Sequence, residues 1–116
     1  MLDYTITRTD NPTSAEELSE ILANPGFGKH FTDHMVTIDW TEEKGWHNAQ
    51  VRPYGPMTME PASNVFHYGQ AIFEGIKAYR QPDDSIATFR PDHNAQRFIN
   101  SAERLACLLY TSPSPR

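Results

Sequence analysis

Two β-rich segments separated by a short turn restrict the possible folds of this chain most strongly. Residues 34–40 alternate in side-chain character, and a second strand runs over residues 46–53 after the turn at residues 42–45. We therefore predict a β-hairpin. Alternation puts side chains on opposite faces of its first strand, with Met35, Thr37 and Asp39 on one face and Val36, Ile38 and Trp40 on the other.

Helix signals flank this hairpin on both sides. Ser14 opens a capping box that predicts a helix over residues 14–23, and the Asn-Pro-Gly sequence at 24–26 ends it. The clearest helix is predicted over residues 92–106. Its apolar stripe consists of Phe98, Ile99, Ala102, Leu105 and Ala106, and its outward face of Gln96, Asn100, Glu103 and Arg104.

The remaining segments predict shorter elements. Residues 54–62 are rich in proline and glycine and predict a loop, with room for a short edge strand. A short helix is expected over residues 70–74, ended by Gly75. Strands at 76–80 and 86–89 flank a turn at 82–85. This mixture predicts an α/β (α+β) fold, and the length of 116 residues allows one domain at most.

Composition and charge exclude several classes of protein. The formal net charge of −5 argues against a nucleic-acid binder, which would carry a basic surplus. The longest apolar run has six residues, far short of the ~20 that a membrane span needs, and the N-terminus has no signal-peptide pattern. A single cysteine excludes an intrachain disulfide framework. We expect a soluble, cytoplasmic protein that binds neither nucleic acid nor membrane.

Isolated candidate residues carry little chemistry by themselves. His30 and His34 have the four-residue spacing of a metal pair on a helix, but the strand pattern that follows argues against a helix there, so no metal site is assigned. Cys107 lies among apolar neighbours, which would raise its pKa and disfavour a nucleophile. Gly69 and Gly75 lack the lysine of a phosphate-binding loop.

Aromatic and cationic residues in the second half offer two interpretations each. Composition favours a core position for Phe73, whereas Tyr68 suits either a buried phenol or a pocket wall. The guanidinium of Arg97 could bind a phosphate, although a solvated helix face is the commoner role of such a residue.

Four sequence blocks resemble the N-terminal region of the branched-chain amino-acid aminotransferases, a class IV pyridoxal-phosphate-dependent family. The blocks occur in the order and spacing of that family, and the likeness runs from about residue 12 to Ala106. They are Phe-Gly-Lys-His-Phe-Thr-Asp-His-Met at 27–35, Met-Glu-Pro-Ala-Ser at 59–63, His-Tyr-Gly-Gln-Ala-Ile-Phe-Glu-Gly-Ile-Lys-Ala-Tyr at 67–79, and Phe-Arg-Pro-Asp-His-Asn-Ala-Gln-Arg at 89–97.

The resemblance implies the small N-terminal domain of a fold-type IV enzyme, a twisted and mostly antiparallel sheet with flanking helices. It implies pyridoxal 5′-phosphate between a small and a large domain, and a homodimer. By the same resemblance, Arg97 matches the arginine that grips the cofactor's phosphate. Tyr68, Phe73 and Phe27 match walls of the pocket for a branched side chain, which suits an apolar, aromatic-lined cavity.

No catalytic residue is assigned within this sequence. In the family, the lysine that forms a Schiff base with the cofactor comes from the large domain. The lysines present here are Lys29, Lys44 and Lys77, and none of them occupies that position. We expect residues 1–12 to form an N-terminal arm, residues 13–106 an incomplete small domain, and residues 107–116 a tail foreign to the family.

The implied activity is exchange of an amino group between leucine, isoleucine or valine and 2-oxoglutarate, in a fragment that we expect to be inactive alone. Two alternatives stay open. Another fold-type IV enzyme, a D-amino-acid transaminase or an aminodeoxychorismate lyase, would keep the fold and change the chemistry. A free-standing binding or dimerisation module would have no catalysis at all.

Overall fold

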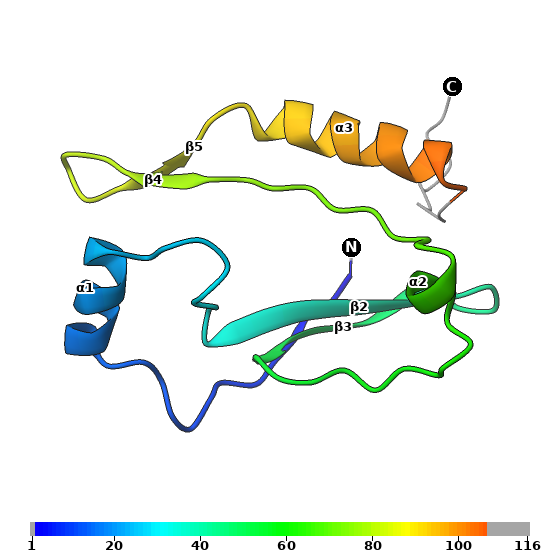
Figure 1. Cartoon of the computed structure of the whole chain (residues 1–116), viewed down its shortest axis with the longest axis horizontal. Helices are drawn as coiled ribbons and strands as arrows, with labels where there is room; N and C mark the ends of the chain where they lie inside the picture. Colours follow the sequence, from blue (N-terminus) through cyan, green and yellow to red (C-terminus); the bar gives the residue numbers. More distant parts are fainter. Residues whose placement is uncertain (1, 107–116) are drawn as a thin grey trace. The chain divides into compact units, whose positions relative to one another are not determined.

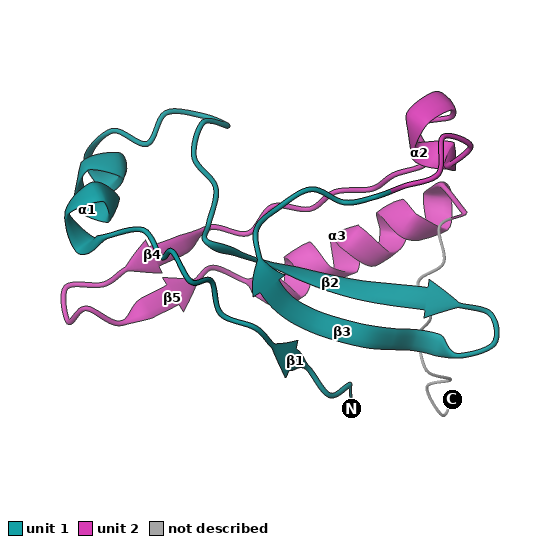
Figure 2. Cartoon of the chain, turned by 90° about the horizontal axis from the view of Figure 1, so that it is seen from below, with its two compact units in different colours: residues 1–58 teal, residues 59–116 magenta. Residues whose placement is uncertain are grey.

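The computed structural model describes residues 2–106, which hold three helices and five strands (Figure 1). The chain divides into two compact units, residues 1–58 and residues 59–116 (Figure 2). The tail expected at residues 107–116, with Cys107, lies outside the described residues. The mixture of small sheets and helices confirms the predicted α/β class.

The first unit is built around the predicted hairpin. Strand β2 (His34–Thr41) pairs antiparallel with strand β3 (Gly45–Pro53), within a residue or so of the expected bounds. Strand β1 (Thr5–Ile6) adds to the other edge of β3 in parallel, so the strand order is β1-β3-β2. The segment expected as an extended arm therefore contributes a short strand, with Thr5 opposite Gln50.

An irregularity interrupts the hairpin where β2 and β3 change register. Thr37 pairs with Gln50 but Asp39 pairs with His47, so two residues of β3 face one residue of β2. Asn48 takes a φ of 52° there, in the left-handed region that asparagine tolerates better than most residues. Its side chain donates to Oδ2 of Asp39 over 2.6 Å. The irregularity is thus a β-bulge stabilised by a side-chain hydrogen bond.

Helix α1 (Ala15–Ala23) begins where the capping box predicts. The hydroxyl of Ser14 accepts a hydrogen bond from the backbone N–H of Glu17 over 3.1 Å. The residue before this cap is also fixed, because Thr13 donates from its hydroxyl and its backbone N–H to the carboxylate of Asp33. These hydrogen bonds hold the pKa of Asp33 below its usual range. These hydrogen bonds therefore connect the start of α1 to the residue that precedes β2.

The second unit contains helix α2 (Asn64–His67), strands β4 (Ala78–Arg80) and β5 (Ile86–Thr88), and helix α3 (Pro91–Arg104). The two strands pair antiparallel, as predicted, around a turn in which the carboxylate of Asp83 accepts hydrogen bonds from Ser85. Helix α3 confirms the predicted long helix, and its stripe residue Ala102 is fully buried.

The short helix predicted over residues 70–74 is wrong. The helix in this region is α2, which lies earlier, and Gly69 with a φ of 59° stops it. Beyond that glycine the chain runs without helix or strand to residue 77. Instead, the side chain of Glu74 bonds Arg97 of α3, and that of Gln70 donates to the carbonyl oxygen of Leu105, which caps the end of α3. Residues 54–62 form the predicted loop, without the edge strand for which the sequence left room.

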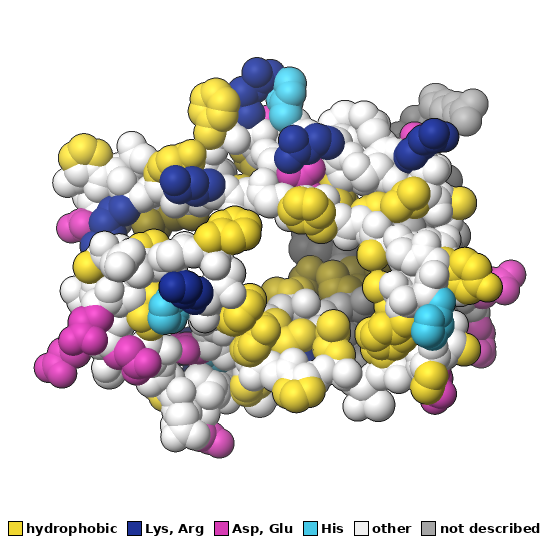
Figure 3. Space-filling view, in the orientation of Figure 1, with side chains coloured by type: hydrophobic (Ala, Val, Ile, Leu, Met, Phe, Trp, Pro, Cys, Tyr) yellow, Lys and Arg dark blue, Asp and Glu magenta, His cyan; other side chains and the backbone are white. Residues whose placement is uncertain are grey.

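Large apolar side chains are mostly exposed in the described part of the chain. Ala49 and Ala102 are the buried hydrophobic residues within residues 2–106, whereas Phe89 is 76% exposed and Phe31 65%. Figure 3 shows hydrophobic side chains spread over much of one face. Exposure on this scale is unusual for a free-standing domain and typical of a surface that another element covers.

No helix within residues 2–106 combines the length and the apolar character that crossing a membrane requires.

Candidate cofactor-binding site

Helix α3 presents the charged and polar residues of the candidate site. The helix starts at Pro91, whose fixed φ and missing N–H suit the first helical position. Arg90 precedes it with a φ of 47°, and its guanidinium contacts the ring of His93. Helix α3 thus begins three residues after the last residue of β5.

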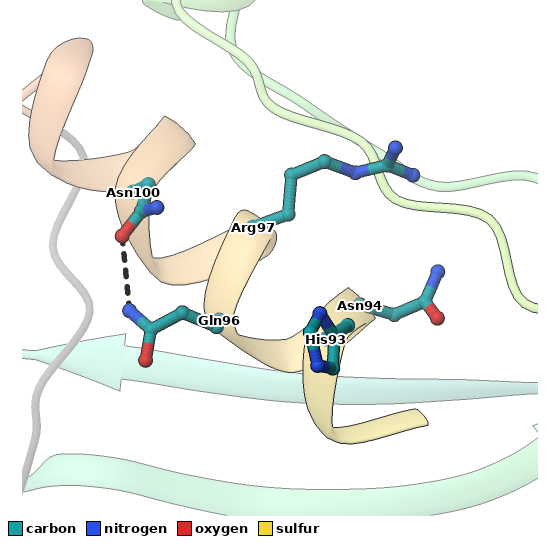
Figure 4. A pocket seen from close by; sticks show the side chains of 5 residues that line it. All are labelled: His93, Asn94, Gln96, Arg97 and Asn100. Atoms are coloured by element: carbon teal, nitrogen blue, oxygen red, sulfur yellow. Dashed lines mark hydrogen bonds between the residues drawn. The ribbon is translucent and has the colours of Figure 1, made fainter. Parts of the chain in front are cut away.

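Asn94 and Arg97 lie three positions apart on α3 and so share one face. Figure 4 shows both side chains extending to the same side of the helix, whereas Gln96 and Asn100 lie on another side. There, Nε2 of Gln96 donates a hydrogen bond to Oδ1 of Asn100 over 2.9 Å. Together with His93, these four residues line a shallow depression on α3. Its lining residues are neutral or cationic.

The partner of Arg97 is Glu74, in the irregular segment that runs beside α3. Nε of Arg97 donates to Oε2 of Glu74 over 2.6 Å, and Nη2 donates to Oε1. The same Oε1 accepts from Nδ2 of Asn94 over 3.0 Å and from the backbone N–H of Gly75 over 3.0 Å. Asn94 also donates to the carbonyl oxygen of Gly75 over 2.9 Å. The carboxylate is thus fixed from three directions.

Exposure and charge differ sharply within this pair. The side chain of Glu74 is 10% exposed, whereas that of Arg97 is 69% exposed. Hydrogen bonds from Arg97, followed by that from Asn94, lower the pKa of Glu74 to about 2. The carboxylate in turn raises the pKa of Arg97. The pair is therefore fully ionised at neutral pH, with its cationic end toward solvent.

The arginine keeps donors for a further anion. A guanidinium has five N–H groups, and the fork onto Glu74 uses the edge formed by Nε and Nη2. The outer edge, formed by Nη1 and Nη2, retains its remaining N–H groups. A phosphate suits such an edge because two parallel N–H donors match two of its oxygens. The chemistry of these donors therefore fits the phosphate of pyridoxal 5′-phosphate.

Tyr68 follows α2 and lines a second depression in the same unit, with Asn64, Gly69, Gln70 and Leu105. This residue is 83% exposed. Gln70 holds this region in place, because its side chain accepts from Asn64 over 2.7 Å and donates to the carbonyl oxygen of Leu105 over 3.3 Å. The loop that carries Tyr68 is thereby fixed to the end of α3.

The other two predicted pocket residues are also exposed. Phe73 is 89% exposed, so the core position favoured by composition is wrong. Phe27 is 100% exposed and belongs to the first unit. Their expected roles as walls of a substrate pocket stay predictions.

His34 and Lys77 make contacts of their own outside the depressions described above. His34 begins β2, and its Nε2 accepts from the backbone N–H of Thr9 over 3.0 Å, so the helix spacing of a metal pair does not apply. Within residues 2–106, no group of three or more His, Cys, Asp or Glu side chains is placed to hold a metal ion. The ammonium of Lys77 lies 5.1 Å from the ring centroid of Tyr79.

Sequence reasoning missed Glu74 and Asn94 as members of this site. The spacing of Asn94 and Arg97 gives the shared helix face, and that signal was available. The pairing with Glu74 spans 23 positions and has no local signature.

Comparison with known proteins assigns the chain to a family. No protein-family profile matches it. The chain is 57% identical to the branched-chain-amino-acid aminotransferase of Mycolicibacterium smegmatis over 105 residues, which are 90% of this chain and 28% of that protein. It is 52% identical to branched-chain-amino-acid transaminase 1 of Bacillus subtilis over 70% of the chain, and 46% identical to the cytosolic enzyme of Saccharomyces cerevisiae over 89%.

The mixed α/β architecture agrees with the small N-terminal domain of a fold-type IV aminotransferase, as expected. Within that class, the chain belongs to the branched-chain amino-acid aminotransferase family, as an N-terminal fragment of a member. It spans about a quarter of the length of these curated relatives.

Proposed function

We propose that the complete protein containing this chain is a branched-chain amino-acid transaminase. It transfers the amino group of leucine, isoleucine or valine to 2-oxoglutarate and releases a branched 2-oxo acid and glutamate. The observation that carries this proposal is the identity of 57% with a branched-chain-amino-acid aminotransferase across 90% of the chain.

Arg97 is the residue of this chain that holds the cofactor. Its exposed guanidinium, on the first turns of α3, binds the phosphate of pyridoxal 5′-phosphate through its outer N–H edge. The cofactor, when bound, supplies the aldehyde that accepts the amino group of the substrate. The fixed contact with Glu74 supports this role, because an arginine that is already oriented loses less freedom on binding.

Tyr68, Phe73 and Phe27 line the pocket for the substrate side chain. Their high exposure supports this role, since aromatic surface left uncovered in this part of the chain is available to a ligand or to another domain. An aromatic wall of this kind excludes water from the branched side chain. It accepts all three substrates, because one methylene changes binding by only about 1–3 kcal/mol.

The catalytic lysine is supplied from outside this chain, as are the remaining contacts to the cofactor. The complete protein is a homodimeric, cytoplasmic enzyme whose partners are these small molecules. We place the aromatic surfaces of this chain against the large domain and the bound substrate.

The experiment uses the complete protein with pyridoxal 5′-phosphate and follows glutamate formation from 2-oxoglutarate. The expected amino donors are L-leucine, L-isoleucine and L-valine, in a ping-pong pattern. Preference for a D-amino acid would replace the proposal with a D-amino-acid transaminase, and pyruvate release from aminodeoxychorismate would replace it with the lyase. Failure with every one of these substrates would contradict the proposal.

A cofactor titration tests the role of Arg97 separately. Arg97→Ala is expected to weaken binding of pyridoxal 5′-phosphate by about 10- to 100-fold, because one or two charge-assisted hydrogen bonds are lost. Binding of pyridoxal, which lacks the phosphate, should change little. Arg104→Ala, which removes an exposed arginine from the last turn of the same helix, is the matched control. Equal affinities in Arg97→Ala and the control would contradict the role.

A further inference from the structure

We propose that Glu74 is a positioning residue, which holds the guanidinium of Arg97 by its Nε/Nη2 edge and leaves the outer edge for the cofactor's phosphate. This inference rests on the proposed phosphate role of Arg97. It adds a second residue to the site, contributed by the segment between α2 and β4 rather than by α3.

The geometry of the fork fixes the plane of the guanidinium. A contact from Nε to one carboxylate oxygen, with a second contact from Nη2 to the other, allows one planar arrangement. A single hydrogen bond would leave the group free to rotate about its bonds. The two-point contact therefore sets the direction in which the outer N–H groups point.

Glu74 is itself held firmly enough to act in this way. Its carboxylate also accepts from Asn94 and from the backbone N–H of Gly75, and its side chain is largely covered. Asn94 adds a second link by donating to the carbonyl oxygen of Gly75. One side chain of α3 thus anchors the carboxylate, and the carboxylate orients another side chain of the same helix.

The sign of the effect separates positioning from simple electrostatics. A carboxylate near a phosphate dianion repels it, so by charge alone the loss of Glu74 would tighten phosphate binding. If Glu74 orients Arg97, its loss weakens phosphate binding instead. The two explanations predict opposite changes in the same measured affinity.

The test measures dissociation constants for pyridoxal 5′-phosphate and for pyridoxal, which lacks the phosphate, in the complete protein. The dissociation constant for pyridoxal divided by that for pyridoxal 5′-phosphate gives the contribution of the phosphate, and this ratio falls when phosphate binding weakens. Glu74→Gln keeps the shape but turns an amide N–H₂ toward an arginine N–H, and we expect it to reduce the ratio about tenfold, as loss of an orienting partner typically does. Glu103→Gln makes the same change at an exposed carboxylate of α3 and should leave the ratio unchanged.

A double variant ties the effect to Arg97. In Arg97→Ala, adding Glu74→Gln should not reduce the ratio any further, because the residue to be oriented is gone. Asn94→Leu, which leaves the fork intact but removes an anchor of Glu74, should reduce the ratio by a smaller factor. An unchanged affinity for pyridoxal shows that a variant is folded, and Asn94→Leu tests the same link if Glu74→Gln disturbs folding.

The possible outcomes are distinct. A reduced ratio in Glu74→Gln but not in Glu103→Gln, with no further loss on the Arg97→Ala background, supports positioning. An unchanged or increased ratio in Glu74→Gln, beside a reduced ratio in Arg97→Ala, overturns the inference about Glu74 alone. An unchanged ratio in Arg97→Ala overturns the phosphate role and the inference with it.

Discussion

Arg97 donates from Nε to Oε2 of Glu74 over 2.6 Å, across 23 positions of sequence. This contact links helix α3 to the irregular segment that precedes β4. The carboxylate of Glu74 is largely covered, whereas the guanidinium of Arg97 is mostly exposed to solvent.

The ionisation of Glu74 predicts a specific dependence of stability on pH. Its pKa is about 2 in the folded state, below the ordinary value of 4.5, so the folded state favours the charged form. The stabilisation by Glu74 is then complete above pH about 4.5 and is lost as pH falls toward 2. Comparing the free energy of unfolding of the complete protein with that of Glu74→Gln between pH 3 and 7 should show a constant difference above pH 5 that shrinks below it. A difference that grows on acidification would refute the assignment.

Removal of the cap on α1 should loosen the start of that helix. Ser14→Ala eliminates the acceptor of the Glu17 amide, and such losses cost about 1 kcal/mol. Hydrogen exchange at the Glu17 amide of the complete protein should therefore accelerate about fivefold. Ser19→Ala, which alters an exposed serine within the same helix, should leave that rate unchanged.

The contact between Thr13 and Asp33 should control access to the N-terminal segment. Thr13→Val keeps the branched shape but removes the hydroxyl that donates to Oδ1 of Asp33, at a cost of about 1 kcal/mol. Trypsin cleavage after Arg8 should become about fivefold faster in the complete protein. Thr5→Val makes the same change on an exposed strand residue and serves as control. Equal cleavage of the two variants would show that the hydroxyl does not anchor this segment.

The 116-residue chain by itself is expected to be inactive and prone to association. It contains no lysine at the family's catalytic position, and apolar side chains such as Phe73 and Phe89 are largely exposed. Incubation with leucine, 2-oxoglutarate and pyridoxal 5′-phosphate should give no glutamate, and light scattering should detect aggregates. A monodisperse protein with a cooperative thermal transition would favour the binding module.

Local patterns predicted much of the fold because the forces behind them act over a few residues. The cap at Ser14 begins α1, the alternation after His34 gives β2, and the stripe through Ala102 gives α3. The family likeness in the sequence pointed to Arg97, and the comparisons confirm the family. The roles of Arg97, Tyr68, Phe73 and Phe27 stay predictions.

The sequence by itself determined where the main helices and hairpins lie, since capping, turn chemistry and hydrophobic periodicity are encoded within single segments. Only the tertiary structure decided that residues 70–77 stay irregular, that β1 joins β3 in parallel, and that Glu74 holds Arg97. Each of these depends on a partner distant in sequence. Hydrogen bonds of Glu74 to α3 and of Gln70 to the residue that caps its end take the place of a local helix. No pattern within the segment indicates which distant groups these side chains will contact.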